Sequence, residues 1–314
     1  MPLFERITLI GLGLIGSSLS HAIRRGKLAG HIAAYDLSPD VRQIAGQLAL
    51  ADSIHNSAAA AVENADLVIS CVPVGANASL AAEIGPLLKS GAILTDVGSV
   101  KSSVLSAMAP HLRADTHFIP GHPVAGTEQS GPRAGFATLF DGRWSILTPA
   151  DDTAPEAIAQ LTDFWRGCGA NVEIMTPQHH DLVLAITSHI PHLIAYNIVG
   201  TAADLEEVTQ SEVVKFSAGG FRDFTRIAAS DPTMWRDVFL NNKDAVLEML
   251  GRFSEDLTAL QRAIRWGDGE ALFDLFTRTR AIRRGIIDAG QETAAPDFGR
   301  HPEVPPKDDT ARSK

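Results

Sequence analysis

Cysteine is scarce in this sequence of 314 residues, which contains only Cys71 and Cys168 and no Cys-x-x-Cys pair. Closely spaced cysteines are the usual sign of a zinc site or a disulfide framework. Neither is expected here, and no metal site is predicted. Cys71 lies within an apolar run, where a cysteine is most simply a small core residue.

Long uninterrupted apolar runs are also missing. No stretch approaches 18 uncharged apolar residues, which is about the length that a membrane-spanning helix needs. The first residues lead directly into a strand-like segment, without a basic, apolar leader. The sequence therefore predicts neither a membrane span nor a secretory signal, and it predicts a cytoplasmic protein.

Positive charge is in deficit: 27 lysines and arginines face 37 acidic residues, for a formal net charge of −10. This is the wrong sign for tracking a phosphate backbone. The nearest basic group, Arg280, Arg283 and Arg284, is small and lies on a helical pattern. No nucleic-acid partner is expected, and the 45% hydrophobic and 20% charged content is typical of a globular protein.

Up to about residue 150, short apolar runs alternate with amphipathic segments. Nearly continuous apolar runs indicate strands covered on both faces, and their alternation with helices predicts a parallel sheet. The expected strands are 7–10, 32–35, 67–72 and 92–95, and the expected helices are 16–26, 41–49, 77–88 and 101–112. The runs at 117–120 and 144–147 are expected to extend this sheet, and 172–175 to add an edge strand after a helix at 154–168. The predicted class is α/β, with a Rossmann-type doubly wound sheet.

Beyond residue 177 the pattern is helical only, which predicts a second, all-helical domain. A long helix is expected over 178–203, bent at Pro191. Apolar residues from Val246 to Ile264 repeat at steps of three and four, so this seam packs against another helix, in the same subunit or in a partner. Four prolines and little apolar content predict a disordered tail at the end. The expected divisions are 1–176, 177–290 and 291–314.

The strongest local motif is Gly11-Leu12-Gly13-Leu14-Ile15-Gly16, between a strand and a helix. Gly11 permits the tight turn, Gly13 lets a pyrophosphate approach the backbone, and Gly16 allows the helix to contact the strand. The helix that the motif opens offers unpaired N–H groups and a positive dipole end to the phosphates. Leu14 and Ile15 of the motif are also expected to bind the cofactor. The motif in this setting predicts a dinucleotide site.

Asp36 ends the second strand, 20 residues after Gly16, where a carboxylate is expected to bind the adenosine ribose. It would repel a 2′-phosphate, so NAD is predicted rather than NADP. The alternative is that Asp36 is a helix cap or turn residue. Val72 and Pro73 follow the third strand and Ser99 follows the fourth, so they are expected to border the cofactor; Ser99 is also a plausible N-cap.

A nicotinamide cofactor needs a substrate carbon that gives or accepts hydride, and usually a base for the hydroxyl proton. His122 is the best candidate because it follows the fifth strand, in a loop expected on the cofactor side. Histidine titrates near neutrality, as such a base requires.

Three long runs carry a resemblance to a known family: 121–131 (GHPVAGTEQSG), 188–192 (SHIPH) and 219–228 (GGFRDFTRIA), with Asp231-Pro232 and Met234-Trp235-Arg236-Asp237 following. In this order they resemble the prephenate/arogenate dehydrogenases of tyrosine biosynthesis. The likeness extends from the glycine loop to about residue 285. It implies a helical domain that forms a homodimer, and oxidative decarboxylation of prephenate or arogenate.

The resemblance also implies roles for individual residues. His122 would be the base and Ser99 would hydrogen-bond the same substrate hydroxyl. The pocket would be lined by residues of the helical domain, and an ionic gate would stand at its entrance. The implied substrate residues are Ser188, His192, Arg226 and Trp235, with Trp235 possible from a second subunit, and the implied gate residues are Glu128 and Asp223.

Simpler interpretations stay open. Asp223 and Arg226 could form a surface ion pair, and His189 and His192 could satisfy a buried bend near Pro191. A hydroxy-acid or imine dehydrogenase of the same plan is one alternative, but it generally has a lysine in the first long helix of the second domain, and none occurs between 177 and 203. A non-enzymatic NAD-responsive regulator is another, but no DNA-binding or partner-binding module is evident.

Overall fold

The computed structural model describes residues 1–127, 129–209 and 218–288. By their internal contacts these residues divide into two compact units, with the boundary between Leu250 and Gly251. The predicted tail at 291–314 and the predicted gate residue Glu128 lie outside the described residues.

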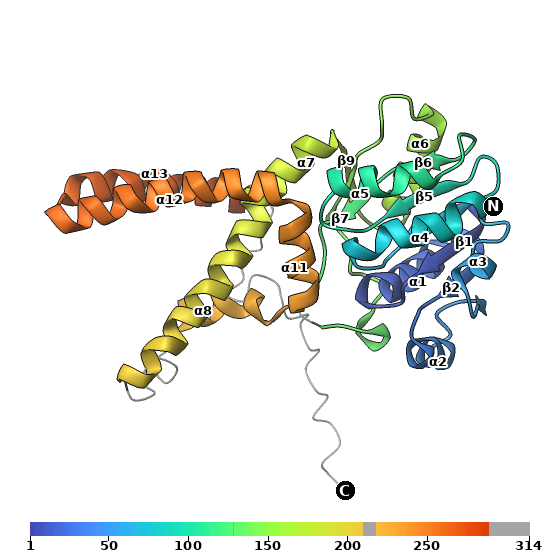
Figure 1. The fold of residues 1–314 in the computed structure, drawn as a ribbon, viewed down its shortest axis with the longest axis horizontal. Helices are drawn as coiled ribbons and strands as arrows, with labels where there is room; N and C mark the ends of the chain where they lie inside the picture. Colours follow the sequence, from blue (N-terminus) through green and yellow to red (C-terminus); the bar gives the residue numbers. More distant parts are fainter. Residues whose placement is uncertain (128, 210–217, 289–314) are drawn as a thin grey trace, which may run out of the picture. The chain divides into compact units, whose positions relative to one another are not determined.

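The first unit begins with a six-stranded parallel sheet of order β3-β2-β1-β4-β5-β6 (Figure 1). Its strands are β1 (Phe4–Ile10), β2 (Ala29–Tyr35), β3 (Ser53–Ile54), β4 (Leu67–Ser70), β5 (Ile93–Asp96) and β6 (His117–Phe118). The sequence did not predict β3, which is only two residues long. The parallel sheet that the apolar runs predicted is otherwise present.

Helices cover both faces of this sheet because successive side chains of a buried strand point in opposite directions. Leu67 and Ile69 of β4 belong to the core shared with α1 and α6, whereas Val68 belongs to the core shared with α3, α4 and α5. The helices are α1 (Leu14–Gly26), α2 (Pro39–Gln47), α3 (Ala58–Ala61), α4 (Asn77–Ile84), α5 (Ser102–Met108) and α6 (Pro155–Gly167).

A separate sheet of three strands corrects two predictions. It consists of β7 (Gly121–Pro123), β8 (Trp144–Leu147) and β9 (Asn171–Ile174), with β7 antiparallel to β8 and β8 parallel to β9. The runs at 144–147 and 172–175 therefore belong to this second sheet and not to the first, and His122 lies in a strand rather than in a loop. The N–H of Ile119 still donates to the carbonyl of Leu94, but the N–H of Gly121 donates to the side chain of Asp96, so the ladder along β5 ends there and the next residues pair with β8.

The predicted long helix after residue 177 is interrupted. It consists of α7 (Pro177–Leu184), a π-helical turn (Ala185–His189) and α8 (Ile190–Thr209). The N–H of Ile190 donates to the carbonyl of Ala185, five residues back. Pro191 explains the wider turn, because its ring clashes with the carbonyl four residues earlier and it donates no hydrogen bond.

By length and composition alone, the helical stretch Pro177–Asp204 could cross a membrane, with a mean hydropathy of 1.5. The sequence did not predict a candidate there because histidines and Asp181 interrupt the apolar residues. In the structure His180, Asp181 and His189 of this stretch are buried against other parts of the first unit.

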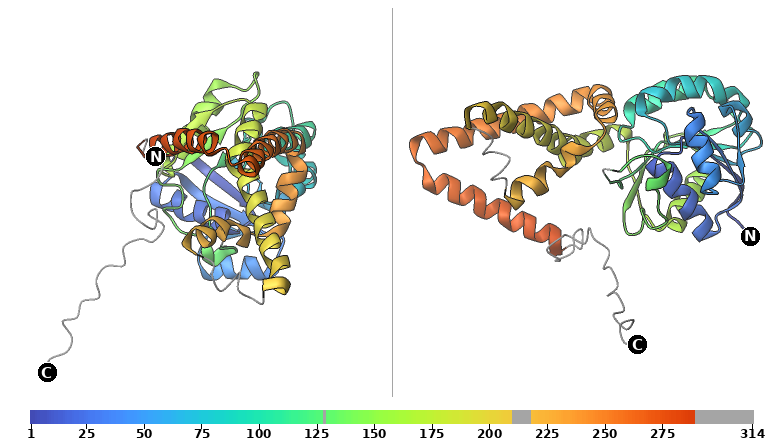
Figure 2. Two further views of the ribbon diagram at one scale, coloured as in Figure 1. Left: turned by 90° about the vertical axis from the view of Figure 1, so that its left-hand side faces the viewer. Right: turned by 90° about the horizontal axis from the view of Figure 1, so that it is seen from below.

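Four further helices complete the described chain: α10 (Gly219–Thr225), α11 (Pro232–Asn241), α12 (Lys243–Trp266) and α13 (Gly269–Asp288). A 3₁₀ turn (Arg226–Ala229) precedes α11. In the second unit, α12 and α13 diverge from the turn at Gly267 (Figure 2). The predicted seam is helical, but Leu257 and Ile264 of that seam are 48% and 66% exposed.

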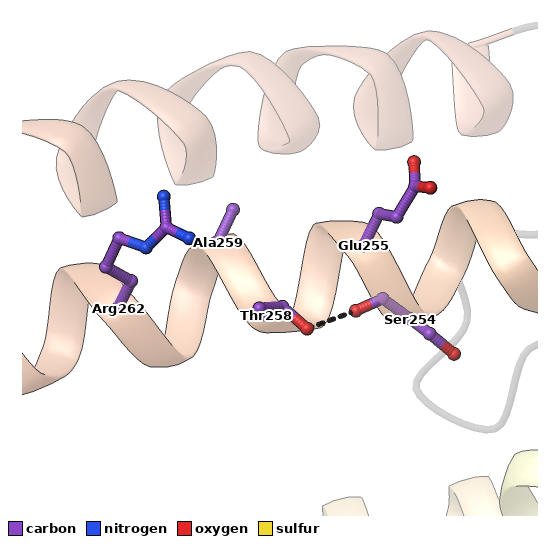
Figure 3. Close-up of a pocket in the computed structure, with 5 residues that line it drawn as sticks. All are labelled: Ser254, Glu255, Thr258, Ala259 and Arg262. Carbon is purple, nitrogen blue, oxygen red and sulfur yellow. Dashed lines mark hydrogen bonds between the residues drawn. The ribbon is translucent and has the colours of Figure 1, made fainter.

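A hollow of about 400 Å³ lies in the second unit (Figure 3). Its lining residues all belong to α12, and two of them, Ser254 and Thr258, share a hydrogen bond within that helix. The glycine loop and all histidines of the described residues belong to the first unit, so the search for a reactive centre concerns that unit.

Candidate active site

The glycine loop has the shape that a pyrophosphate requires. Gly11 has φ +94°, and a Cβ there would lie 2.7 Å from the carbonyl oxygen of Cys71. A Cβ at Gly16 would lie 2.0 Å from the carbonyl oxygen of Gly11. A Cβ at Gly13, the N-cap of α1, would meet nothing within 4 Å, so a ligand can approach the backbone here. Leu14 and Ile15 are half-buried in the first turn of α1.

The side-chain carboxylate of Asp36 is hydrogen-bonded to this loop. One carboxylate oxygen accepts a hydrogen bond from the N–H of Leu12 at 2.8 Å, and the other accepts one from the N–H of Ser38 at 2.9 Å. Asp36 is thus a turn residue as well as a ribose candidate, since each oxygen has a second lone pair. The N-cap of the following helix is Ser38.

A buried ion pair joins the loop after β5 to strand β7. Lys101 and Asp96 are fully buried, and Nζ of Lys101 contacts both carboxylate oxygens of Asp96 and the carbonyl oxygen of Gly121, at 2.5–2.6 Å. Burial lowers the pKa of Lys101, against the opposing effect of Asp96. These bonds fix the segment that contains Ser99 beside the residue that precedes His122.

His122 is 6% exposed and begins a chain of buried hydrogen bonds. Its Nδ1 lies 2.8 Å from Nε2 of His180, and Nδ1 of His180 lies 2.9 Å from Oδ1 of Asp181. The two rings pack edge to face, with centroids 5.1 Å apart. Burial, followed by His180 whenever it is itself protonated and by the positive charge of Lys101, holds the pKa of His122 well below its ordinary value. His122 is therefore uncharged at neutral pH, as a general base must be.

Asp181 caps helix α5 from outside. Its carboxylate accepts the N–H groups of Lys101 and Ser102 at 2.8 and 2.9 Å. Burial would raise its pKa, but the hydrogen bonds from His180, Ser102 and Lys101 lower it on balance. The prediction that Ser99 caps this helix is wrong, because α5 begins only at Ser102 and its N-cap residue is Lys101. Ser99 is half-buried, two residues before that position.

The predicted pocket residues of the helical part lie together. The rings of His192 and Trp235 are stacked, with centroids 3.7 Å apart and an angle of 25°. Nδ1 of His192 donates to the carbonyl oxygen of Ser188 at 2.8 Å. Trp235 is buried, and its indole N–H has no hydrogen-bond partner among the described residues. The stacking is within one chain.

His189 is fully buried beside this pair and is held by α11. The side-chain amide of Asn242, the C-cap of α11, donates to Nδ1 of His189 at 3.1 Å and to the carbonyl oxygen of Asp181 at 2.9 Å. Burial, followed by His180 when it is itself protonated, lowers the pKa of His189 to about 4. Sequence reasoning did not assign His180, Asp181 or Asn242 to the site; consecutive charged residues in an apolar helix, such as His180-Asp181, are a signal that could have identified them.

The predicted carboxylate-binding residue Arg226 and the described gate residue, Asp223, lie at the surface. Arg226 begins the 3₁₀ turn before α11 and is exposed, and its charge contributes, after burial, to lowering the pKa of His192. Asp223 is exposed in α10. The gate therefore stays a prediction, as do Val72, which is half-buried, and Pro73, which is exposed after β4.

A phosphate-accommodating glycine loop, a carboxylate after the second strand and a buried neutral histidine define a nicotinamide-dependent dehydrogenase. Residues 19–174 match the nucleotide-binding domain of prephenate dehydrogenase, and residues 176–278 match its dimerization domain. The chain belongs to the prephenate/arogenate dehydrogenase family.

Individual relatives agree with this assignment. The chain is 43% identical over 287 residues to cyclohexadienyl dehydrogenase of Zymomonas mobilis, covering 91% of this chain and 97% of that protein. It is 34% identical to prephenate dehydrogenase of Bacillus subtilis, covering 94% of this chain and 79% of that protein. Prephenate dehydrogenase of Aquifex aeolicus, solved with hydroxyphenyl propionate and NAD⁺, has a TM-score of 0.84 at 32% identity, covering 90% and 98%. The predicted family, fold class, oxidoreductase activity and use of NAD are confirmed.

Proposed function

We propose that the protein oxidatively decarboxylates prephenate to 4-hydroxyphenylpyruvate, with NAD as the acceptor, in the cytoplasmic synthesis of tyrosine. The observation that carries the proposal is the position of His122, which is 6% exposed. It lies directly after the residue that the Asp96–Lys101 ion pair fixes, at the carboxyl end of the sheet, where α/β proteins bind their ligands.

The residues present suit this chemistry. NAD, when bound, supplies the acceptor for the hydride that leaves the ring carbon bearing the hydroxyl. His122 takes the hydroxyl proton, and Ser99 hydrogen-bonds the same oxygen. The electron pair of the breaking carbon–carboxylate bond enters the ring and carbon dioxide departs. The ring becomes aromatic as its oxygen takes the proton back from His122, which gives the phenol and restores the base.

The substrate is a dianion, whereas the chain has a net charge of −10. Local positive charge must therefore attract it, and the planar guanidinium of Arg226 matches a carboxylate bidentately. The stacked rings of His192 and Trp235, with the unpartnered indole N–H, form a second contact region beside Ser188. Glu128 and Asp223 would act as the gate near Arg226.

Activity on arogenate as well is the second candidate. It is favoured by the 43% identity to a cyclohexadienyl dehydrogenase, which extends over nearly the whole of both chains. Arogenate differs from prephenate in its side chain, which is alanyl instead of pyruvyl, and the ring that reacts is the same. The oxidation at His122 would therefore be common to both substrates.

We also propose that the protein is a homodimer. The dimerization-domain match covers 176–278, and the second unit exposes large apolar side chains, including Phe273 at 69% and Phe276 at 57%. Protein contacts, not lipid, would then cover the apolar stretch Pro177–Asp204, whose buried His180 and Asp181 a bilayer would not accommodate. No nucleic-acid or membrane partner is part of the proposal.

Substrate specificity is tested by following NADH formation with prephenate, arogenate and simple 2-hydroxy acids. We expect turnover of prephenate, and of arogenate if specificity is dual. Turnover of the hydroxy acids alone would contradict the proposal and favour the alternative dehydrogenase. No turnover at all would favour a regulator.

His122→Asn tests the base. The variant should lower kcat by about 10²–10⁴ because general-base catalysis contributes that much, while NAD binding measured by fluorescence titration stays close to that of the native protein. A kcat within a factor of two of the native value would remove His122 from the mechanism.

A further inference from the structure

The hydrogen bonds from Asp181 to His122 have a defined direction. Oδ1 of Asp181 accepts the N–H of Lys101, and Oδ2 accepts that of Ser102. These bonds stabilise the carboxylate form, which has no proton to donate. Nδ1 of His180, at 2.9 Å from Oδ1, must therefore carry the proton of that bond.

The direction of this hydrogen bond determines the direction of the next one, between His180 and His122. A neutral imidazole carries one proton, so Nε2 of His180 has a lone pair and accepts the bond from Nδ1 of His122 at 2.8 Å. We infer that His180 and Asp181 are positioning residues that hold His122 with its proton on Nδ1, so that Nε2 presents the lone pair. This inference rests on the proposed function, in which Nε2 of His122 receives the substrate proton.

The opposite tautomer would be inactive as a base at Nε2. If Nε2 of His122 carried the proton, Nδ1 would have to accept from His180, and Nδ1 of His180 would then meet the Asp181 carboxylate with its lone pair. Two acceptors would face each other in a buried site, which costs the free energy of an unmade hydrogen bond. The chain of bonds therefore favours one tautomer of His122 over the other.

Several contacts keep Asp181 in place. Its carboxylate lies at the N-terminus of α5, where both the N–H groups and the helix dipole favour negative charge. Its own carbonyl accepts a bond from Asn242 of α11 at 2.9 Å. Asp181, the last acceptor in this series of hydrogen bonds, is thus held by α5 and α11 as well as by its own helix.

The proton transfer is balanced within this arrangement. The O–H bond of the substrate breaks, an N–H bond forms at Nε2 of His122, and the ring becomes a cation whose Nδ1–H still donates to His180. Of the charged or titratable groups around the ring, Lys101 opposes the cation, as do His180 and His189 when they are themselves protonated. The Asp181 carboxylate acts on the next ring, where it raises the pKa of His180 against the effect of burial. Asp96 partly neutralises Lys101.

Nitrogen NMR tests the tautomer without any turnover. In protein labelled with ¹⁵N-histidine, long-range proton–nitrogen spectra distinguish protonated from unprotonated ring nitrogens, and His122→Asn identifies the signals of His122. We expect an unprotonated Nε2 and a protonated Nδ1 at neutral pH. A protonated Nε2 would overturn the inference, whatever the substrate proves to be.

Kinetics with prephenate test the function of the tautomer. In His180→Phe the ring shape is kept but no acceptor remains, so kcat should fall by about 10–100-fold with KM little changed. The acid limb of kcat/KM should move to lower pH, because the cation of His122 loses its hydrogen-bond acceptor. His180→Gln, whose amide oxygen can accept from Nδ1, should recover part of the loss.

His179→Gln is the matched control, since His179 is exposed on the same helix one residue away. It should leave kcat and the pH profile unchanged. If His180→Phe lowers kcat without moving the acid limb, and His180→Gln restores nothing, the role of His180 is merely structural and the inference fails. If instead prephenate is not turned over by the native protein while the NMR result holds, the proposed function fails and the tautomer assignment stands.

Discussion

Asp36 is the residue on which cofactor choice depends. Asp36→Ala removes the carboxylate that accepts ribose hydroxyls and repels a 2′-phosphate, so the preference for NAD over NADP should fall by about tenfold or more, the equivalent of one hydrogen bond to a charged group. The ratio of kcat/KM for the two cofactors measures it. Asp40→Ala, an exposed carboxylate in the next helix, is the control, and an unchanged ratio at position 36 would reject the ribose contact.

The buried histidines make stability depend on pH. His189 has a pKa of about 4 in the folded protein and about 6.5 when unfolded. The unfolded chain binds more protons between these values, so the free energy of unfolding should fall as the pH is lowered from 6.5 to 4, by about 3 kcal/mol from this residue. His122 and His180, whose pKa values are also lowered by burial, act in the same direction.

Urea unfolding at several pH values between 7 and 4 checks this. His189→Leu should show a shallower decline than the native protein, whereas His179→Leu should show the same decline. If the free energy of unfolding declines equally with falling pH in the native protein and in His189→Leu, the lowered pKa of His189 is contradicted.

Single residues also mark the limit of sequence reasoning. His122 could be proposed as the base from the sequence because it follows a strand and belongs to a family motif. The contact that His180 makes with it could not be predicted, since the two residues are 58 positions apart. Asp181 was missed for the same reason: it caps a helix 80 positions away in the chain, while Ser99, which is closer in sequence, lies too early to do so.

At the scale of elements, the parallel strands were predictable because their apolar runs are continuous. The second sheet was not, because strands of three or four residues do not reveal their pairing partners. The bend at Pro191 was predictable as a bend, but its form as a π-helical turn depends on how the flanking helices are held.

The Asp96–Lys101 pair links two of these elements, the end of β5 and the start of β7. In Lys101→Met the Asp96 charge stays buried without its partner, so the free energy of unfolding should fall by about 3–5 kcal/mol. The double variant with Asp96→Asn should recover much of this, because no charge then remains. Urea unfolding of the NAD-free protein is the measurement.

The control for this prediction is Lys89→Met. Lys89 forms a hydrogen-bonded ion pair with Asp66, but its side chain is 40% exposed. An exposed pair contributes about 1 kcal/mol or less. A loss for Lys101→Met no greater than that for Lys89→Met would contradict the structural importance of the buried pair.

At the scale of the whole molecule, the seam of α12 was predicted as a packing surface without a defined partner. Val246 at its start is buried in the chain, but the later members Leu257 and Ile264 are exposed. The apolar spacing does not determine which surface covers these side chains, because the spacing is the same whether the covering helix belongs to the same subunit or to a second one. The structure of a single chain does not determine it either.

Leu257→Asp tests whether a second copy covers the seam. In a symmetric dimer the substitution occurs on both subunits, and each loses a buried leucine worth about 1.5–3 kcal/mol and gains a carboxylate that must be desolvated. The dissociation constant of the dimer, measured by analytical ultracentrifugation, should therefore rise at least about tenfold, and monomer should accumulate on dilution. Leu87→Asp is the matched control, because Leu87 is an equally exposed leucine, at 51%, in the nucleotide-binding part. If both variants dissociate at the same concentration as the native protein, the seam does not belong to the dimer interface.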